Sequence, residues 1–89
     1  MEKQWLVYIL RCGDGTLYTG TTDDLPHRLQ MHRAGKGAKY TRGRGPLTLA
    51  YRENAESYSA ALKREYQIKQ LTRAEKLKMI EHYTAAAAE

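Results

Sequence analysis

Two short apolar segments joined by a glycine-rich turn restrict the fold of this chain more than any other feature. Residues 5–12 (WLVYILRC) and 16–21 (TLYTGT) are rich in β-branched and aromatic side chains, and Gly13-Asp14-Gly15 lies between them. Strands favour such side chains, and a short loop containing Asp and Gly favours a tight turn. The sequence therefore predicts a β-hairpin near the start of the chain.

The register of this hairpin decides whether Tyr8 and Tyr18 lie on the same face. A two-residue loop at positions 14–15 would place the two rings on opposite faces, whereas a three-residue loop at 13–15 would place them on one face. A three-residue loop ends on a residue with positive φ, which Gly15 adopts at little cost. We predict the three-residue loop and a shared face.

The rest of the chain indicates one more strand and several helices. First come a helix from Asp23 or Asp24 to about Arg33, with Pro26 in its first turn, and a short helical turn near Tyr40. A strand over 47–52, opened by Pro46, follows. The last two elements are a helix from Ser57 or Ser59 to about Gln70 and a helix that begins at the capping-box pair Thr72 and Glu75. The order β-β-α-β-α-α predicts an α+β fold, with a small three-stranded, mainly antiparallel sheet flanked by helices.

Helical spacing selects the side chains that share one side of each helix. The residues predicted to lie together are Leu25, Arg28, Leu29 and His32 in the first helix, Tyr58, Ala61, Leu62, Ile68 and Leu71 in the second, and Ala74, Leu77 and Ile80 in the third. For the second and third helices we expect these sides to face the core.

A chain of 89 residues has room for one domain with one core. We assign residues 1–83 to this domain and expect 84–89 to be a flexible C-terminal tail. The single cysteine, Cys12, excludes an internal disulfide, and the apolar run at 5–10 is too short to span a bilayer. No secretory signal is visible, so we expect a cytoplasmic protein without a membrane partner.

Basic side chains are concentrated between residues 33 and 44, where no acidic residue occurs, and the formal net charge of the chain is +5. Glycines at 35, 37, 43 and 45 alternate with them, which lets the backbone approach a ligand closely. A solvated basic loop is the alternative, but the clustering favours contact with phosphates. The candidate nucleic-acid-binding residues are Arg33, Lys36, Lys39, Tyr40, Arg42 and Arg44.

One carboxylate and one basic pair occupy unusual helical positions. Glu65 follows Ala61 by four residues and precedes Ile68 by three, so it shares their side of the helix. An ion pair with an arginine, a side chain that reaches the surface, and a metal ligand all remain open, because a buried unpaired carboxylate is costly. Arg28 and His32 are four residues apart and can both contact a phosphate, although a solvated helix face is the common alternative.

Other catalytic and metal-binding patterns are not found. The sequence contains no Walker loop, and His27, His32 and His82 do not have the spacing of a zinc site. Ser57 and Ser59 do not lie in a nucleophile elbow.

Taken in order, these residues resemble the GIY-YIG nuclease superfamily over about residues 4–80. Val7-Tyr8 and Tyr18-Thr19-Gly20 match its paired motif, and Arg28 and Glu65 match its two other functional positions. The segment GKGAKYTRGRGP and the later LKREYQIK are similar to its small, stand-alone bacterial branch. Leu6 and Thr19 depart from the motif, and the only asparagine, Asn54, does not follow the glutamate helix as in some members.

The resemblance implies an endonuclease that hydrolyses phosphodiester bonds in nucleic acid, with DNA favoured over RNA as the substrate and Mg²⁺ or Mn²⁺ as cofactor. Glu65 would hold the metal, Arg28 would bind the scissile phosphate, and Tyr8 would act as general base beside Tyr18. A phenol titrates at about 10, so this role requires that Arg28 and the metal lower the Tyr8 pKa. His32 resembles a histidine found in part of the family, and we include it among the candidate catalytic residues.

Two other functions remain open at this point. The same basic segment and strand tyrosines would suit a nucleic-acid-binding module without catalysis, because a fold does not guarantee an activity. A protein-interaction domain whose charge only keeps it in solution is the third possibility.

Overall fold

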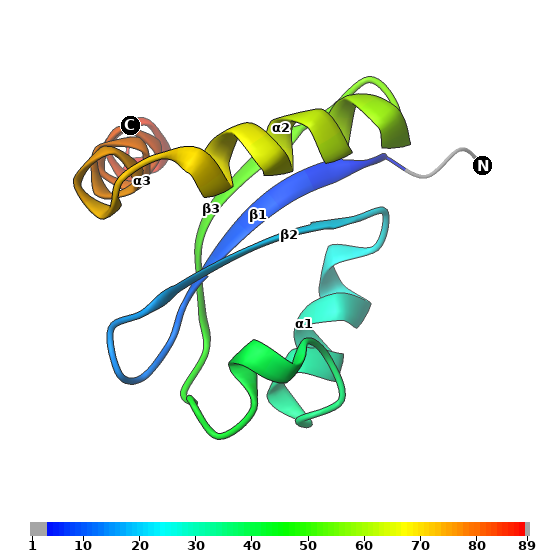
Figure 1. Ribbon diagram of the computed structural model, residues 1–89, viewed down its shortest axis with the longest axis vertical. Coiled ribbons are helices and arrows are strands. Elements are labelled where there is room, and N and C mark those ends of the chain that lie inside the picture. The colour runs from blue at the N-terminus through cyan, green and yellow to red at the C-terminus, as the bar shows by residue number, and fades with distance from the viewer. Residues whose placement is uncertain (1–3, 89) are drawn as a thin grey trace.

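The computed structural model describes residues 4–88, which form a three-stranded sheet with helices on both sides (Figure 1). The elements are, in chain order, β1 (Leu6–Arg11), β2 (Leu17–Thr22), α1 (Leu25–Arg33), the 3₁₀ turn η1 (Lys39–Thr41), β3 (Thr48–Asn54), α2 (Tyr58–Gln70) and α3 (Arg73–Ala88). The strand order is β2-β1-β3 and both pairs are antiparallel. The predicted α+β class and element order are confirmed.

The hairpin has the predicted three-residue loop. The Gly15 amide donates to the Cys12 carbonyl at 2.9 Å, and Gly15 has a φ of 85°. Tyr18 pairs with Leu10, two residues from Tyr8 along β1, so both tyrosines point to the same face of the sheet.

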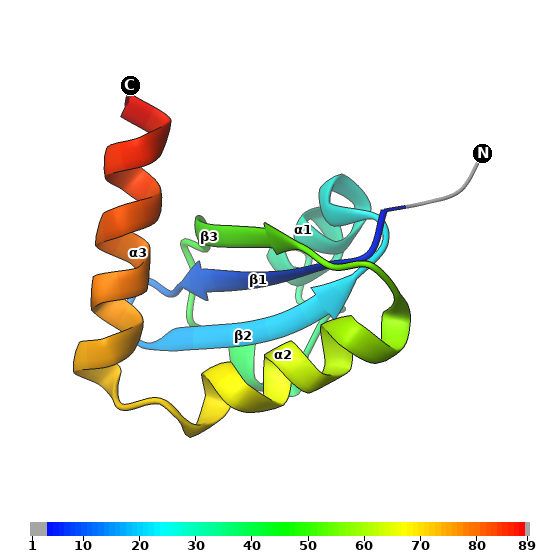
Figure 2. The same cartoon turned by 90° about the horizontal axis from the view of Figure 1, so that it is seen from above.

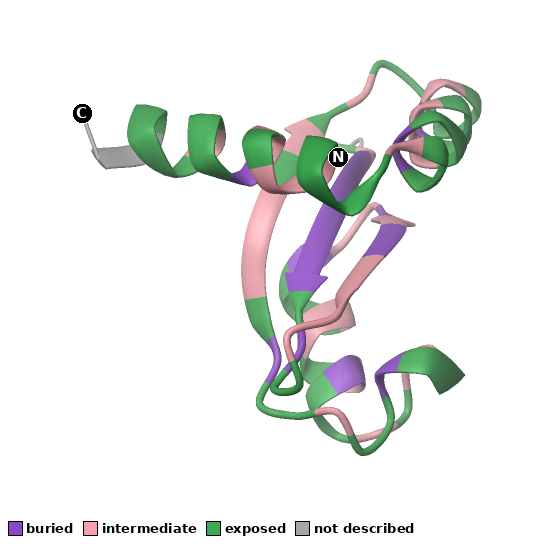
Figure 3. Cartoon of the chain, turned by 60° about the vertical axis from the view of Figure 1, so that its left-hand side comes forward, coloured by how far each residue is buried: buried purple, intermediate pink, exposed green. Residues whose placement is uncertain are grey.

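The central strand β1 is buried on both faces, because helices cover both sides of the sheet (Figure 3). On one face, Val7 and Ile9 pack against α2 and α3. On the other face, Tyr8 and its neighbours pack against α1 through Leu25. This arrangement places the Tyr8 ring on the α1 face.

The helix starts agree with the sequence. Asp24 accepts from the His27 amide at 3.3 Å, and Ser57 accepts from the Ala60 amide at 3.0 Å. Thr72 and Glu75 exchange two hydrogen bonds, as a capping box does. These caps fix where α1, α2 and α3 begin.

The predicted inner side of α2 is wrong at Tyr58 and Leu62. Ala61 and Ile68 are fully buried against the sheet, but Tyr58 is 51% exposed and Leu62 is 42% exposed. Together with Tyr66, which is also exposed, they form a stripe spaced by four residues that the sheet does not cover.

The prediction for α3 also needs correction. Ile80 is buried and Leu77 packs against the core, but Ala74 is exposed. Residues 84–88, which we expected to belong to a flexible tail at 84–89, continue α3, and the Thr84 hydroxyl donates to the Ile80 carbonyl at 2.9 Å. Residue 89 lies outside the described residues, and the flexibility of the tail stays a prediction. Figure 2 shows α3 standing across one end of the sheet. Within the described residues, no helix is long and apolar enough to cross a membrane.

Candidate active site

Tyr8 begins a buried hydrogen-bond chain that links β1, α1 and η1. Its hydroxyl is 2.8 Å from His32 Nε2, and His32 Nδ1 is 2.9 Å from the Thr41 hydroxyl. Thr41 is also 2.9 Å from the Ala38 carbonyl, which can only accept, so the Thr41 hydroxyl donates there. We assign to His32 the tautomer in which Nδ1 donates to Thr41 and Nε2 accepts the Tyr8 proton. The Ala38 amide, 3.4 Å from Nδ1, is directed at the same nitrogen and would donate to it in the other tautomer.

Two glycines make room for this chain. A Cβ on Gly20 would lie 2.6 Å from the Tyr8 hydroxyl, and a Cβ on Gly37 would lie 2.4 Å from His32 Nδ1. Both distances are far below van der Waals contact, so any larger residue would displace Tyr8 or His32. The tyrosine ring therefore lies directly over the backbone of the neighbouring strand.

Tyr18 and Arg28 complete the α1 side of the site. The Tyr18 ring lies 6.3 Å from that of Tyr8 and 5.2 Å from that of His32, and Tyr18 is only partly buried. Arg28 interacts with both phenols, and its hydrogen bond to Tyr8 is the largest effect that raises the Arg28 pKa. The guanidinium therefore lies beside both hydroxyls.

The electrostatics differ from the expectation for a phenolate base. Burial raises the pKa of Tyr8 to about 12, although hydrogen bonding to Arg28 acts in the lowering direction. Arg28 alone therefore does not lower the Tyr8 pKa as a phenolate base requires, because loss of hydration outweighs the nearby charge. Burial, and then the charge of Arg28, lower the pKa of His32, which favours a neutral imidazole able to accept a proton.

Glu65 reaches the same region from the opposite face of the sheet. Thr21 pairs with Val7 and so faces α2, and its hydroxyl donates to Glu65 Oε1 at 2.8 Å. Lys69 Nζ donates to Oε2 at 2.9 Å, so the ion pair is with a lysine. The charge of Glu65 contributes to raising the Tyr8 pKa, which places both groups within electrostatic reach. Since β2 is an edge strand, the site extends across that edge.

The Glu65 carboxylate is compatible with a hydrated divalent ion. Its side chain is 21% exposed, Thr21 fixes one oxygen, and the other oxygen faces only the half-exposed Lys69. Mg²⁺ commonly keeps several waters and takes one or two carboxylates. Among the described residues, no three His, Cys, Asp or Glu side chains cluster. The donor set therefore fits a water-rich site for a hard cation and does not fit a zinc centre.

Two of the predicted nucleic-acid-binding arginines make internal contacts. Arg33 donates to the Leu47 carbonyl at 3.2 Å. Arg44 donates to the Tyr40 carbonyl at 2.7 Å and forms an ion pair with Asp14 at 2.6 Å. These contacts attach the segment to β3 and to the hairpin turn, so both arginines have a structural role whatever they bind.

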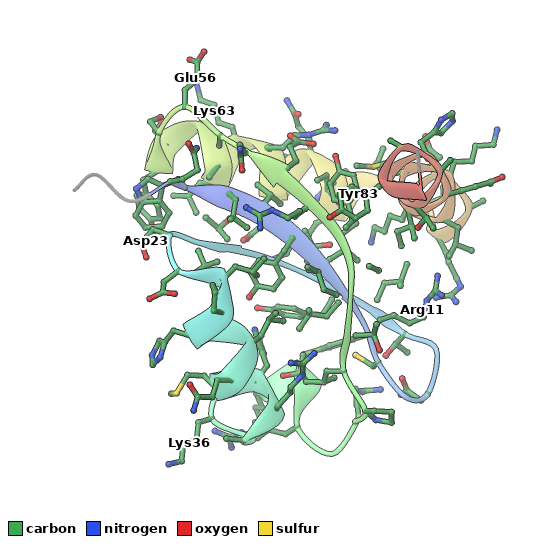
Figure 4. The ribbon with its side chains drawn as sticks, turned by 180° about the vertical axis from the view of Figure 1, so that it is seen from behind. Arg11, Asp23, Lys36, Glu56, Lys63 and Tyr83 are labelled. Atoms are coloured by element: carbon green, nitrogen blue, oxygen red, sulfur yellow. The ribbon has the colours of Figure 1, made fainter. Side chains whose placement is uncertain are left out.

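The other members of the set are more available. Lys36, Lys39 and Arg42 are exposed, and Figure 4 shows Lys36 pointing away from the body of the molecule. The Tyr40 ring stacks on Tyr18 with the centroids 6.0 Å apart. The glycine-rich segment thus lies beside the α1 side of the site.

Sequence reasoning missed three residues that hold the site together. Thr41 orients His32, Thr21 positions Glu65, and Lys69 neutralises that carboxylate. Only Lys69 had a usable signal, because a lysine four residues after a glutamate on a helix commonly forms an ion pair. The two threonines contact partners 9 and 44 residues away in sequence, and local patterns do not show such contacts.

Comparison with known proteins identifies a single family. The model of the family described as "GIY-YIG catalytic domain" matches residues 4–78. The UPF0213 protein OB0043 of Oceanobacillus iheyensis is 60% identical over 81 residues, which is 91% of this chain and 94% of that protein. A UPF0213 protein of Streptococcus sanguinis is 51% identical over 98% of this chain and 100% of its own length. These names state no activity.

Two solution NMR structures have a similar fold. The UPF0213 protein BH0048 from Bacillus halodurans is 45% identical, with a TM-score of 0.57 over 88% of this chain and 83% of that chain. The protein EF2693 from E. faecalis is 36% identical, with a TM-score of 0.64 over 94% of this chain and 90% of that chain.

Proposed function

Because this chain belongs to the GIY-YIG nuclease superfamily, we propose that it is a divalent-metal-dependent endonuclease that cuts phosphodiester bonds, in DNA rather than RNA. The observation that supports this most is that Tyr8, Tyr18 and Arg28, from three different elements, lie together on the α1 face, while the part-exposed Glu65 carboxylate of α2 lies within electrostatic reach of Tyr8. In this proposal the open edge of β2 lets all four act on one phosphodiester.

In this proposal Arg28 binds the scissile phosphate. Its guanidinium already lies beside two phenol oxygens, and a planar donor of this kind binds two phosphate oxygens at once. Its fixed positive charge offsets the charge that develops on the phosphoryl oxygens in the transition state.

Tyr8 and His32 together take the proton from the attacking water. Tyr8 donates its own proton to His32 Nε2 as its oxygen receives the proton of the water, so no free phenolate forms despite the high pKa. The water oxygen bonds to phosphorus and the bond to the 3′ oxygen breaks. Tyr8 is fully buried, so water reaches it after Arg28 turns toward the phosphate, and the more accessible Tyr18 positions that water.

Glu65 would hold Mg²⁺ or Mn²⁺ together with water molecules, with Thr21 fixing the carboxylate. When bound, the ion polarises a phosphoryl oxygen and stabilises the leaving 3′ oxygen. The Lys69 ammonium must move from Oε2 for a cation to bind there, and an exposed pair at this helical spacing is weak enough to allow it.

The Glu65→Gln variant separates an endonuclease from a passive nucleic-acid-binding module. We expect cleavage to fall by at least about a hundredfold, because a neutral amide holds a divalent ion poorly, while binding in chelator is retained. Glu56→Gln makes the same charge change at a residue that points away from the site (Figure 4) and should cleave like the wild type.

The substrates should be a panel of labelled single-stranded, duplex and branched DNA and RNA, with Mg²⁺, Mn²⁺ or chelator. Binding without cleavage under all these conditions would instead support the passive module. Cleavage that survives Glu65→Gln would remove Glu65 from the metal site, and faster cleavage of RNA would contradict the choice of DNA.

A further inference from the structure

A groove runs along the edge strand β2, from the site described above toward the hairpin turn. It consists of two adjoining hollows, one of about 260 Å³ and one of about 190 Å³. Leu17, Tyr40 and Lys76 line both of them, so they form one continuous surface. We call it the β2 groove.

The charged residues that line the β2 groove are all basic. Lys69 comes from the end of α2, and Arg73 and Lys76 come from the first turns of α3. No acidic residue lines either hollow. Lys76 is partly buried, and its side chain has no hydrogen-bond or ion-pair partner among residues 4–88. A partly desolvated ammonium without a counter-charge is suited to an anionic ligand.

The β2 groove joins the active site at one end. Tyr18, which contacts Tyr8 and His32, forms part of its wall, and so does Lys69, which contacts Glu65. The groove then follows β2 back toward Thr16 at the hairpin turn. A ligand that leaves the Arg28 region along the edge of the sheet therefore meets Lys76 and then Arg73.

We propose that the β2 groove binds the phosphodiester backbone of the nucleic-acid strand immediately beside the bond that is cut. Lys76 and Arg73 contact successive phosphates, and Leu17 with the edge of Tyr40 contacts the sugars between them. This inference rests on the proposed function, because it takes the occupant to be the strand that is cut at the site. It adds α3 to the binding surface, which is otherwise limited to residues 33–44.

The test is equilibrium binding of a labelled single-stranded oligodeoxynucleotide in chelator, measured over a range of salt concentrations. We expect Lys76→Met to weaken binding roughly three- to tenfold at low salt. It should also make the salt slope, which is the slope of the logarithm of the binding constant against the logarithm of the salt concentration, less steep by about 0.7. This is the value for one lost phosphate contact on a single strand. Arg73→Met should act in the same direction, and Lys76→Arg should bind like the wild type. Thermal unfolding of each variant checks that it is folded.

Lys78→Met is the matched control, because Lys78 is exposed on the same helix and does not line the groove. It removes one positive charge and should leave both affinity and salt slope near those of the wild type. Equal losses for Lys76→Met and Lys78→Met would reduce the effect to net charge and overturn the proposal. Unchanged binding in both Lys76→Met and Arg73→Met would also overturn it.

The result is independent of catalysis. If the protein binds nucleic acid through Lys76 but cuts nothing with any metal, the proposed endonuclease activity is wrong and the proposal that the β2 groove binds nucleic acid still holds. If a variant without Lys76 and Arg73 binds and cuts like the wild type, only the proposal that the β2 groove binds the strand is wrong.

Discussion

The Tyr8 hydroxyl is held between a neutral imidazole that accepts its proton and a guanidinium that faces its oxygen. Neither contact requires the phenol to ionise. At the scale of single residues, Tyr8 is therefore better suited to pass a proton to His32 than to act as a standing phenolate. This role follows from burial, which raises the Tyr8 pKa to about 12.

Replacement of Tyr8 by phenylalanine tests this role. Tyr8→Phe removes the proton path but keeps the ring, and we expect kcat to fall by about 10² to 10⁴, the usual contribution of a general base. Tyr51→Phe is the control, since it removes a hydroxyl that donates to Glu53. Steady-state cleavage rates measure both, and near-normal turnover in Tyr8→Phe would rule out the path.

Which site residues can be predicted depends on how local their signals are. Tyr8 and Tyr18 follow from the hairpin register, which Gly15 fixes, and Arg28 and His32 follow from one helix face. Glu65 has an unusual position in its helix, but the sequence could not choose between its possible partners. Lys69 was the partner, and it was not among the alternatives we named.

At the scale of elements, the short turn η1 supports α1. Thr41 of η1 is 2% exposed, and its hydroxyl lies 2.9 Å from Nδ1 of His32, which belongs to α1. In the tautomer that we assign, the turn accepts the Nδ1 proton of a histidine that lies nine residues earlier in the chain. The glycine-rich segment thus has a structural function in addition to any contact with nucleic acid.

Thr41→Val tests this support, because valine has nearly the same shape and no hydroxyl. His32 Nδ1 then loses its acceptor, and we expect a loss of about 1–3 kcal/mol in unfolding free energy together with a lower kcat. Thr41→Ser restores the hydroxyl and should recover most of both. Denaturant titrations and cleavage rates provide the measurement, and equal activity in the valine and serine variants would argue against the tautomer assignment.

Element boundaries were more predictable than element faces. The sequence left the first two helix starts open between Asp23 and Asp24 and between Ser57 and Ser59, and the structure shows the caps at Asp24 and Ser57. The predicted capping box at Thr72 is confirmed. The predicted core-facing side of α2 is wrong at Tyr58 and Leu62, because a sheet of three strands covers only part of the apolar stripe on that helix. Sequence periodicity gives the direction of a stripe but not the width of the surface opposite it.

At the scale of the whole molecule, the site is assembled from both faces of one sheet. Tyr8 lies on the α1 face and Glu65 comes from the α2 face, and in the proposed function both would act on one ligand across the open edge of β2. The ion pair of Arg44 with Asp14 keeps the glycine-rich segment against the hairpin turn at the same edge. No local sequence pattern predicts which residues from the two faces come near one another, because that depends on how the helices pack on the sheet.

Folding should also depend on pH through His32. Its folded pKa lies below the ordinary value of 6.5, so below that pH the unfolded chain binds a proton that the folded chain does not. The stabilisation is fully present above about pH 6.5 and is lost as the pH falls toward the folded pKa, by at most about 1.4 kcal/mol per pH unit for one group. Chemical unfolding between pH 7.5 and about 5 measures this.

The control for this pH dependence is His32→Gln, which removes the titrating group and keeps polar atoms. It should be less stable than the wild type at neutral pH but should lose less stability on acidification. His27 and His82 are exposed and remain in both proteins. If the unfolding free energies of the two proteins fall in parallel as the pH is lowered, His32 does not cause the pH dependence.

Nicking of covalently closed circular DNA by the wild-type chain is the most direct test of whether the four side chains at the β2 edge form a metal-dependent endonuclease. We predict that nicked circles accumulate with Mg²⁺ or Mn²⁺, that chelator stops the reaction, and that Arg28→Ala and Glu65→Gln remove it while Glu56→Gln does not. Intact circles with every metal, or nicking that continues in Glu65→Gln, would contradict this account.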